Sequence, residues 1–108
     1  MIKKLANKMV QILDYHKGEK ILLMPLKDNS VIADYFVIAQ GNTVQQVRSM
    51  ADYLEEELKK EYEITHIRID GYDEGKGIVL DYGDIIVHLF RKEEREYYNI
   101  ERLWTSVV

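Results

Sequence analysis

The sequence predicts an α+β fold, in which helices pack on a mixed sheet of about five strands. The order of hydrophobic patterns along the chain is helix, strand, strand, helix, strand, hairpin and short terminal helix. The strongest local pattern is a hairpin at residues 78–90, where two β-branched runs flank Gly83-Asp84. A length of 108 residues suits one hydrophobic core, so we expect a single domain over residues 1–108.

The first part of the chain is expected to form one helix and two strands. Apolar residues at three- and four-residue spacing predict a helix over residues 2–18, with Gly18 as its stop signal. Two continuous apolar runs, residues 21–24 and 35–39, are each expected to form a buried strand. Pro25 ends the first of them, because proline cannot donate to a strand ladder.

The middle of the chain is predicted to hold the longest helix. Thr43 and Gln46 match a capping box, in which each side chain satisfies a free amide at the start of a helix. The apolar stripe that follows continues to about Glu61. Residues 65–70 alternate between polar and apolar side chains, which predicts a half-exposed strand with Ile67 on its inward side.

The remaining segments are a loop, the hairpin and a tail. Residues 71–77 are polar and rich in glycine, so we expect a loop there. After the hairpin, Tyr97, Ile100 and Trp104 recur at helical spacing, which predicts a short amphipathic helix folded back on the sheet. Adjacent Tyr97 and Tyr98 point in different directions on such a helix, so we expect one of them to remain available for an interface.

Composition excludes several classes of function. The chain has 19 acidic and 15 basic residues, a net charge of -4, which disfavours direct sequence-specific binding to nucleic acid and leaves room for a basic protein partner. Cysteine is absent, which excludes disulfides, thiolate metal sites and a cysteine nucleophile. No apolar run approaches the roughly 20 residues that span a membrane, so we expect no membrane association and a cytoplasmic location.

Four residues at or near the predicted hairpin turn carry chemistry: Asp81, Tyr82, Asp84 and His88. Two carboxylates three residues apart can hold a divalent cation together with substrate phosphates. One hypothesis is therefore a nucleotide- or metal-dependent enzyme of the nucleotidyltransferase type that uses Asp81 and Asp84. Such enzymes also need a Gly-Ser segment to position the phosphates, and we find none upstream. The other interpretation is a turn aspartate beside a surface carboxylate, in a hairpin that binds a partner.

Other signatures of catalysis are missing from the sequence. His16, His66 and His88 are too dispersed for a metal-binding spacing. We expect His88 to be a satisfied histidine on a sheet face and His66 to face water. Neither a nucleophile elbow nor a phosphate-binding glycine fingerprint is present. We therefore expect no catalytic residue, no metal site and no cofactor.

Four segments, in order along the chain, resemble the ribosomal silencing factor, or Iojap, family. They are Ser30-x-x-Ala-Asp-Tyr-Phe-Val-Ile-Ala39, Gly41-Asn-x-x-x-Gln-Val-Arg48, Leu80-Asp-Tyr-Gly-Asp-Ile-Ile-Val-His88 and Glu93-Glu-Arg-Glu-Tyr-Tyr-x-Ile-Glu-Arg-Leu-Trp104. The resemblance implies a nucleotidyltransferase-like fold without the transferase active site. It also implies a protein that binds the large ribosomal subunit through ribosomal protein L-fourteen. Such a protein blocks joining of the small subunit, represses translation when nutrients are scarce and forms a homodimer in isolation.

Residues that match the family's motifs are candidates for partner binding. The resemblance implies this role for Asp70, Asp81, Tyr82, Asp84, His88, Tyr98, Glu101 and Trp104. The sequence departs from the family's pattern at two positions. Gly77 stands where a tryptophan is common, just before the first hairpin strand, and Pro25 stands where an aspartate is common.

Overall fold

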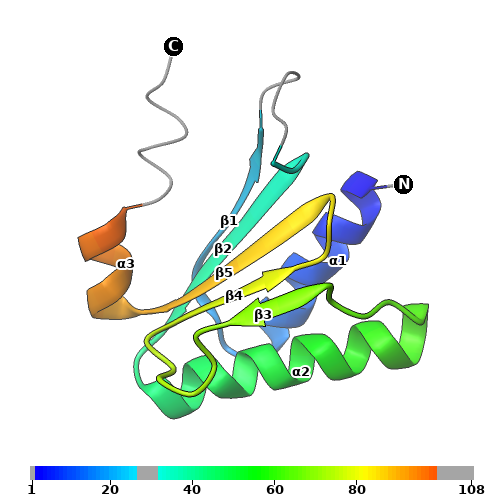
Figure 1. The fold of residues 1–108 in the computed structure, drawn as a ribbon. Helices are drawn as coiled ribbons and strands as arrows, with labels where there is room; N and C mark the ends of the chain where they lie inside the picture. The colour runs from blue at the N-terminus through cyan, green and yellow to red at the C-terminus, as the bar shows by residue number, and fades with distance from the viewer. Residues whose placement is uncertain (1, 27–31, 100–108) are drawn as a thin grey trace.

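The computed structural model describes residues 2–26 and 32–99, which form a five-stranded sheet and three helices (Figure 1). The helices are α1 (Ile2–Tyr15), α2 (Val44–Tyr62) and α3 (Lys92–Tyr98). The strands are β1 (Glu19–Pro25), β2 (Tyr35–Gly41), β3 (Arg68–Asp70), β4 (Gly77–Asp81) and β5 (Ile85–Arg91). Their order in the sheet is β1-β2-β5-β4-β3, with β2 and β5 parallel and the other neighbours antiparallel. This architecture confirms the predicted fold class.

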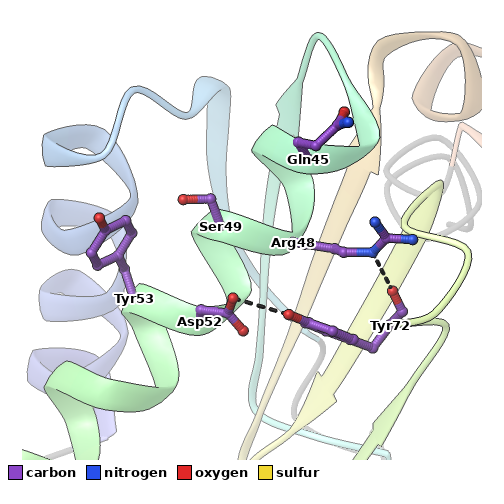
Figure 2. Close-up of a pocket in the computed structure, with 6 residues that line it drawn as sticks. All are labelled: Gln45, Arg48, Ser49, Asp52, Tyr53 and Tyr72. Carbon is purple, nitrogen blue, oxygen red and sulfur yellow. Dashed lines mark hydrogen bonds between the residues drawn. The ribbon is translucent and has the colours of Figure 1, made fainter.

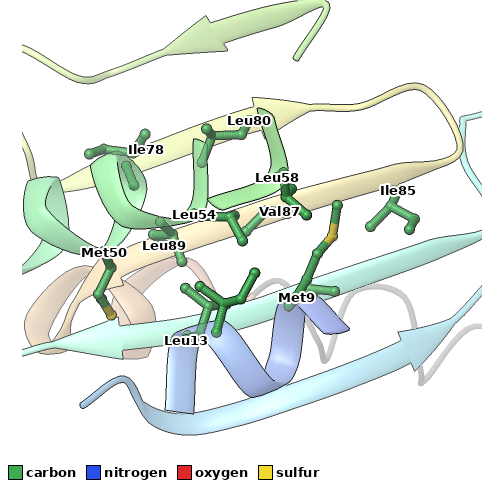
Figure 3. Close-up of a cluster of buried hydrophobic side chains, with 14 of the residues drawn as sticks. Met9, Leu13, Met50, Leu54, Leu58, Ile78, Leu80, Ile85, Val87 and Leu89 are labelled. Atoms are coloured by element: carbon green, nitrogen blue, oxygen red, sulfur yellow. The ribbon is translucent and has the colours of Figure 1, made fainter. Parts of the chain in front are cut away.

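The main hydrophobic core lies between one face of the sheet and the helices α1 and α2 (Figures 1 and 3). Alternate residues of the strands point into it, as the two-residue period of a strand requires. Leu54 and Leu58 of α2 meet Val87 and Leu89 of β5 there, and all four are fully buried. We call the opposite side of the sheet the second face. It carries a smaller apolar cluster: Met24, Ala33, Phe36, Ile38 and Phe90.

α1 ends and α2 begins close to the predicted positions, but some of the residues that terminate and cap them act differently from what was predicted. The residue with a positive φ after α1 is Lys17, at 68°, and Gly18 then donates its amide to the Leu13 carbonyl. Gly18 is needed because an added Cβ would lie 2.9 Å from that carbonyl oxygen. At the start of α2, Thr43 accepts from the Gln46 amide as predicted, but the Gln46 side chain accepts from the Asn42 amide.

Two details of the predicted strands were wrong. β1 lies at the edge of the sheet, so its apolar run is half-buried rather than buried. β3 is shorter than the predicted strand, and Ile67 is 73% exposed instead of facing inward. The Ile67 amide still donates to the Asp81 carbonyl, although its side chain is exposed. None of the helices in the described ranges is long and apolar enough to cross a membrane.

Candidate functional site

The strand register brings the second-face residues into rows across the sheet. One row runs from Asp70 on β3 through Val79 on β4 and His88 on β5 to Ile38 on β2. The adjacent row, nearer α3, pairs Gly77 with Phe90. These rows place an apolar strip at the centre of the face and charged side chains at its β3 edge.

A hollow of about 570 Å³ lies where the second face meets α3. We call it the Gly77 hollow, because the missing side chain of Gly77 helps to form it. Its lining consists of Glu74, Lys76, Gly77, Val79, His88, Phe90, Glu94, Tyr97 and Tyr98. The ring of Phe90 covers the glycine, since a Cβ added there would lie 3.3 Å from two of the ring carbons. An aromatic side chain opposite a strand glycine restores packing that the glycine cannot supply.

His88 forms part of the floor of this hollow. Its side chain packs edge-on against Phe36 at 4.6 Å between ring centroids and lies nearly parallel to Phe90. It is only 8% exposed, and neither ring nitrogen has a hydrogen-bond partner within the described residues. Burial lowers the pKa of His88 to about 4, so the imidazole is neutral at pH 7. The structure confirms a sheet position, and the described residues supply no hydrogen bond that satisfies the ring.

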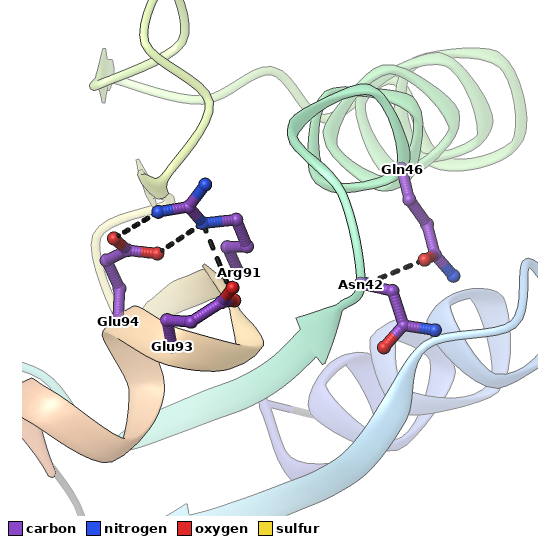
Figure 4. Close-up of polar contacts among 5 residues, drawn as sticks. All are labelled: Asn42, Gln46, Arg91, Glu93 and Glu94. Carbon is purple, nitrogen blue, oxygen red and sulfur yellow. Dashed lines mark hydrogen bonds and ion pairs between the residues drawn. The ribbon is translucent and has the colours of Figure 1, made fainter.

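The loop between β3 and β4 forms one wall of the hollow, and α3 forms the opposite wall. An ion pair fixes α3 at the end of β5. Arg91 donates from Nε and Nη2 to the two carboxylate oxygens of Glu94, each at 2.8 Å (Figure 4). This bidentate bond lowers the pKa of the Glu94 carboxyl. Tyr98 then stacks on Phe90 at 6.1 Å, while Tyr97 meets the Tyr98 ring edge-on. Both tyrosines are exposed, Tyr97 by 82% and Tyr98 by 55%.

The hairpin turn gives its two carboxylates separate surroundings. Gly83 has φ +90°, and Asp84 is not among the residues with positive φ, as in a type II′ turn. The Asp81 carboxylate accepts from the Gly83 amide at 2.8 Å, which stabilises the turn. The Asp84 side chain is exposed, and its backbone carbonyl accepts from Asp34 and Tyr35. Within residues 2–26 and 32–99, no three acidic or histidine side chains are grouped to hold a metal.

Tyr82 is the predicted site residue that lies farthest from expectation. It packs against the main core, on the side of the sheet that α1 and α2 cover. Its hydroxyl is buried without a hydrogen-bond partner among the described residues, and burial together with nearby Glu55 raises the pKa of the phenol. His66 lies beside it and donates to Glu55, so the expectation that His66 faces water was wrong.

The structure therefore brings only some of the predicted site residues together. Asp70, His88 and Tyr98 share the second face, whereas Asp81 and Asp84 lie at the hairpin end. Glu101 and Trp104 lie outside the described residues. The lining residues Glu74 and Lys76 were missed by sequence reasoning. The cross-strand pairing of Gly77 with Phe90, which follows from the length of the hairpin, was the signal that could have located the hollow.

Comparison with known proteins shows similarity along nearly the whole chain. The profile of the family described as "Ribosomal silencing factor during starvation" matches residues 1–107. The chain is 39% identical to the ribosomal silencing factor of Halalkalibacterium halodurans over 95 residues, which cover 88% of this chain and 80% of the relative. It is 29% identical over 99 residues to a mouse protein named "Mitochondrial assembly of ribosomal large subunit protein 1", covering 90% of this chain and 43% of that protein. A crystal structure of a Chromobacterium violaceum protein, 25% identical, superposes with a TM-score of 0.91 over 97% of this chain and 87% of that one.

Proposed function

The chain belongs to the ribosomal silencing factor family, and from that premise we propose that it binds the large ribosomal subunit and prevents the small subunit from joining. The proposed contact is ribosomal protein L-fourteen, and the proposed outcome is repression of translation in the cytoplasm when nutrients are limiting. The name of the mouse relative refers to the large ribosomal subunit, which supports the choice of subunit. The mechanism is occlusion, so it requires no catalytic residue, metal or cofactor.

The observation that carries this proposal is the Gly77 hollow with its two tyrosines. Tyr97 and Tyr98 are exposed beside a concave, partly aromatic surface of the sheet. Tyrosine is enriched at the centres of protein interfaces, because it combines a large apolar ring with a polar tip. A hollow beside such rings can receive a side chain of the partner and exclude water around it.

The charge of the chain favours a basic partner. The net charge is -4, and the exposed carboxylate of Asp84 lies at the hairpin turn, whereas the Asp70 carboxylate at the β3 edge pairs with Arg68 at 3.1 Å. Complementary charge raises the rate of encounter and disfavours wrong partners. The proposed contact surface of the ribosomal protein is therefore basic.

Sedimentation of mixed ribosomal subunits through a gradient tests the proposal. Saturating protein is expected to keep the subunits apart, and undiminished joining would refute it. Tyr97→Ala is expected to weaken binding to isolated large subunits by about tenfold, the loss typical of an interface tyrosine. Its matched control is Tyr15→Ala on α1, since Tyr15 is also 82% exposed but lies away from the hollow. Equal effects of the two substitutions would argue against this surface.

The acidic residues are tested in the same assay. Asp84→Lys is expected to slow association with the large subunit, and the effect is expected to shrink as salt is added. Asp14→Lys on α1 is the control, because it makes the same charge change at another exposed position. Light scattering of the isolated protein tests the expected homodimer by measuring its mass in solution.

A further inference from the structure

The loop between β3 and β4 forms one wall of the Gly77 hollow and is tightly closed. Gly71 and Gly75 both have positive φ, at 82° and 72°, and the Gly75 amide donates to the Gly71 carbonyl at 3.0 Å. The two ends of the loop touch, since a Cβ added to Gly71 would lie 2.0 Å from the Gly77 carbonyl oxygen. The loop contributes Glu74 and Lys76 to the hollow.

Two residues of α2 hold this loop from the opposite side of the sheet (Figure 2). Arg48 donates from Nε to the Tyr72 carbonyl at 3.0 Å and from Nη2 to the Asp73 carbonyl. The Tyr72 hydroxyl donates to the Asp52 carboxylate at 2.9 Å, which raises the pKa of the phenol. Arg48 and Asp52 are four residues apart, so they lie on one side of α2. We call these three hydrogen bonds the α2 clamp.

The β3–β4 loop contains two glycines with positive φ, so its backbone must be restrained if the loop is to form a wall of a binding site. Loops are more mobile than the elements they connect, and a partner that must order a loop binds more weakly. The backbone of Lys76 is held at its other end, because its carbonyl accepts from the Arg91 amide at 2.8 Å. The α2 clamp supplies the restraint nearer β3, where Gly71 and Gly75 leave the backbone most freedom.

We propose that Arg48 and Asp52 are positioning residues for binding of the large ribosomal subunit, acting through the β3–β4 loop without touching the partner. This inference rests on the proposed function. The planar guanidinium of Arg48 meets two carbonyls at once, which the single ammonium of a lysine cannot reproduce. Geometry rather than charge is therefore the property of Arg48 that matters.

The experiment measures affinity for isolated large subunits with full-length variants. Arg48→Ala and Arg48→Lys are both expected to weaken binding by about tenfold, as when the loop has the competent conformation for about a tenth of the time. Tyr72→Phe, which removes the bond to Asp52, is expected to weaken binding by a smaller factor. Asp52→Asn keeps an acceptor for the Tyr72 hydroxyl and is expected to bind as the wild type does. Gln45→Ala is the control, because Gln45 lines the same surface pocket as Arg48 and Asp52 but takes no part in the α2 clamp (Figure 2).

Two further readouts separate positioning from direct contact and from stability. Amide hydrogen exchange is expected to accelerate at Gly75 in Arg48→Lys but not at Val87 in the core, with the variant fully folded at the assay temperature. In Arg48→Ala, the salt dependence of binding is expected to stay unchanged. If Arg48 instead touched a phosphate of the ribosomal RNA, its loss would reduce the salt dependence. Full affinity in Arg48→Lys would overturn the inference, because charge alone would then suffice. If the wild type itself fails to bind large subunits, the proposed function fails as well.

Discussion

Acidification is expected to destabilise the protein through His88, the buried imidazole on the second face. Burial lowers the pKa of His88 to about 4 in the folded protein, whereas histidine in an unfolded chain titrates near 6.5. Between these pH values the unfolded chain binds a proton that the folded chain excludes. The free energy of unfolding therefore falls as the pH is lowered through this window, and the loss is complete below about pH 4.

The structure gives the size of this effect. One pKa unit corresponds to about 1.4 kcal/mol, so the complete loss is about 3 kcal/mol. Between pH 7.5 and pH 5 the same linkage gives a loss of about 2 kcal/mol. His88→Leu removes the titrating group with little change in side-chain volume. It breaks no hydrogen bond within the described residues, because the ring makes none there. Urea unfolding of both proteins at the two pH values measures the difference.

The leucine variant is the control for every other titrating group. All other ionisable groups are the same in the two proteins, so their contributions cancel in the comparison. We expect the stability of His88→Leu relative to the wild type to rise by about 2 kcal/mol when the pH falls from 7.5 to 5. An unchanged difference between the two proteins would refute the reasoning, since it would mean that His88 takes up its proton without cost in the folded state.

Three further predictions concern stability measured by urea or thermal unfolding. Tyr82→Phe removes a buried hydroxyl without a hydrogen-bond partner among the described residues, so stability is expected to stay equal or rise, and a loss above about 1 kcal/mol would contradict this. Gly83→Ala places a Cβ at φ +90° and is expected to cost about 1–2 kcal/mol, seen as a lower Tm. Leu54→Ala empties a fully buried position and is expected to cost about 2–5 kcal/mol, and a smaller loss would indicate that the core collapses around the gap.

The fold was predictable because its elements are strongly periodic and well punctuated. Short sequence patterns predicted three features that the structure contains: the apolar stripe of α2, the Thr43 cap and the Gly83 turn. Ile67 was misplaced because alternation along a strand says which residues share a face, not whether another element covers each of them. The edge position of β1 depends on pairing between distant segments, which no local pattern reports.

The candidate site was less predictable, because it depends on which way side chains turn after register is set. Tyr82 and Asp84 are two residues apart around the turn, yet one packs in the core and the other is exposed. Family resemblance marks such residues together without saying what each one touches. The Gly77 hollow arises from a missing side chain opposite Phe90, and it becomes visible only once β4 and β5 are paired.

Two polar groups of the hairpin, Asp81 and His88, lie where the fold itself determines their state. Asp81 stabilises the Gly83 turn, and His88 is kept neutral by burial beneath the hollow. Tyr97 and Tyr98 are accessible beside the hollow, as are Glu74 and Lys76 in its lining. Arg48 restrains the loop wall of the hollow, and Arg91 restrains its helix wall. Walls restrained in this way around an aromatic recess support the proposed recognition of a protein surface, because preorganisation increases affinity.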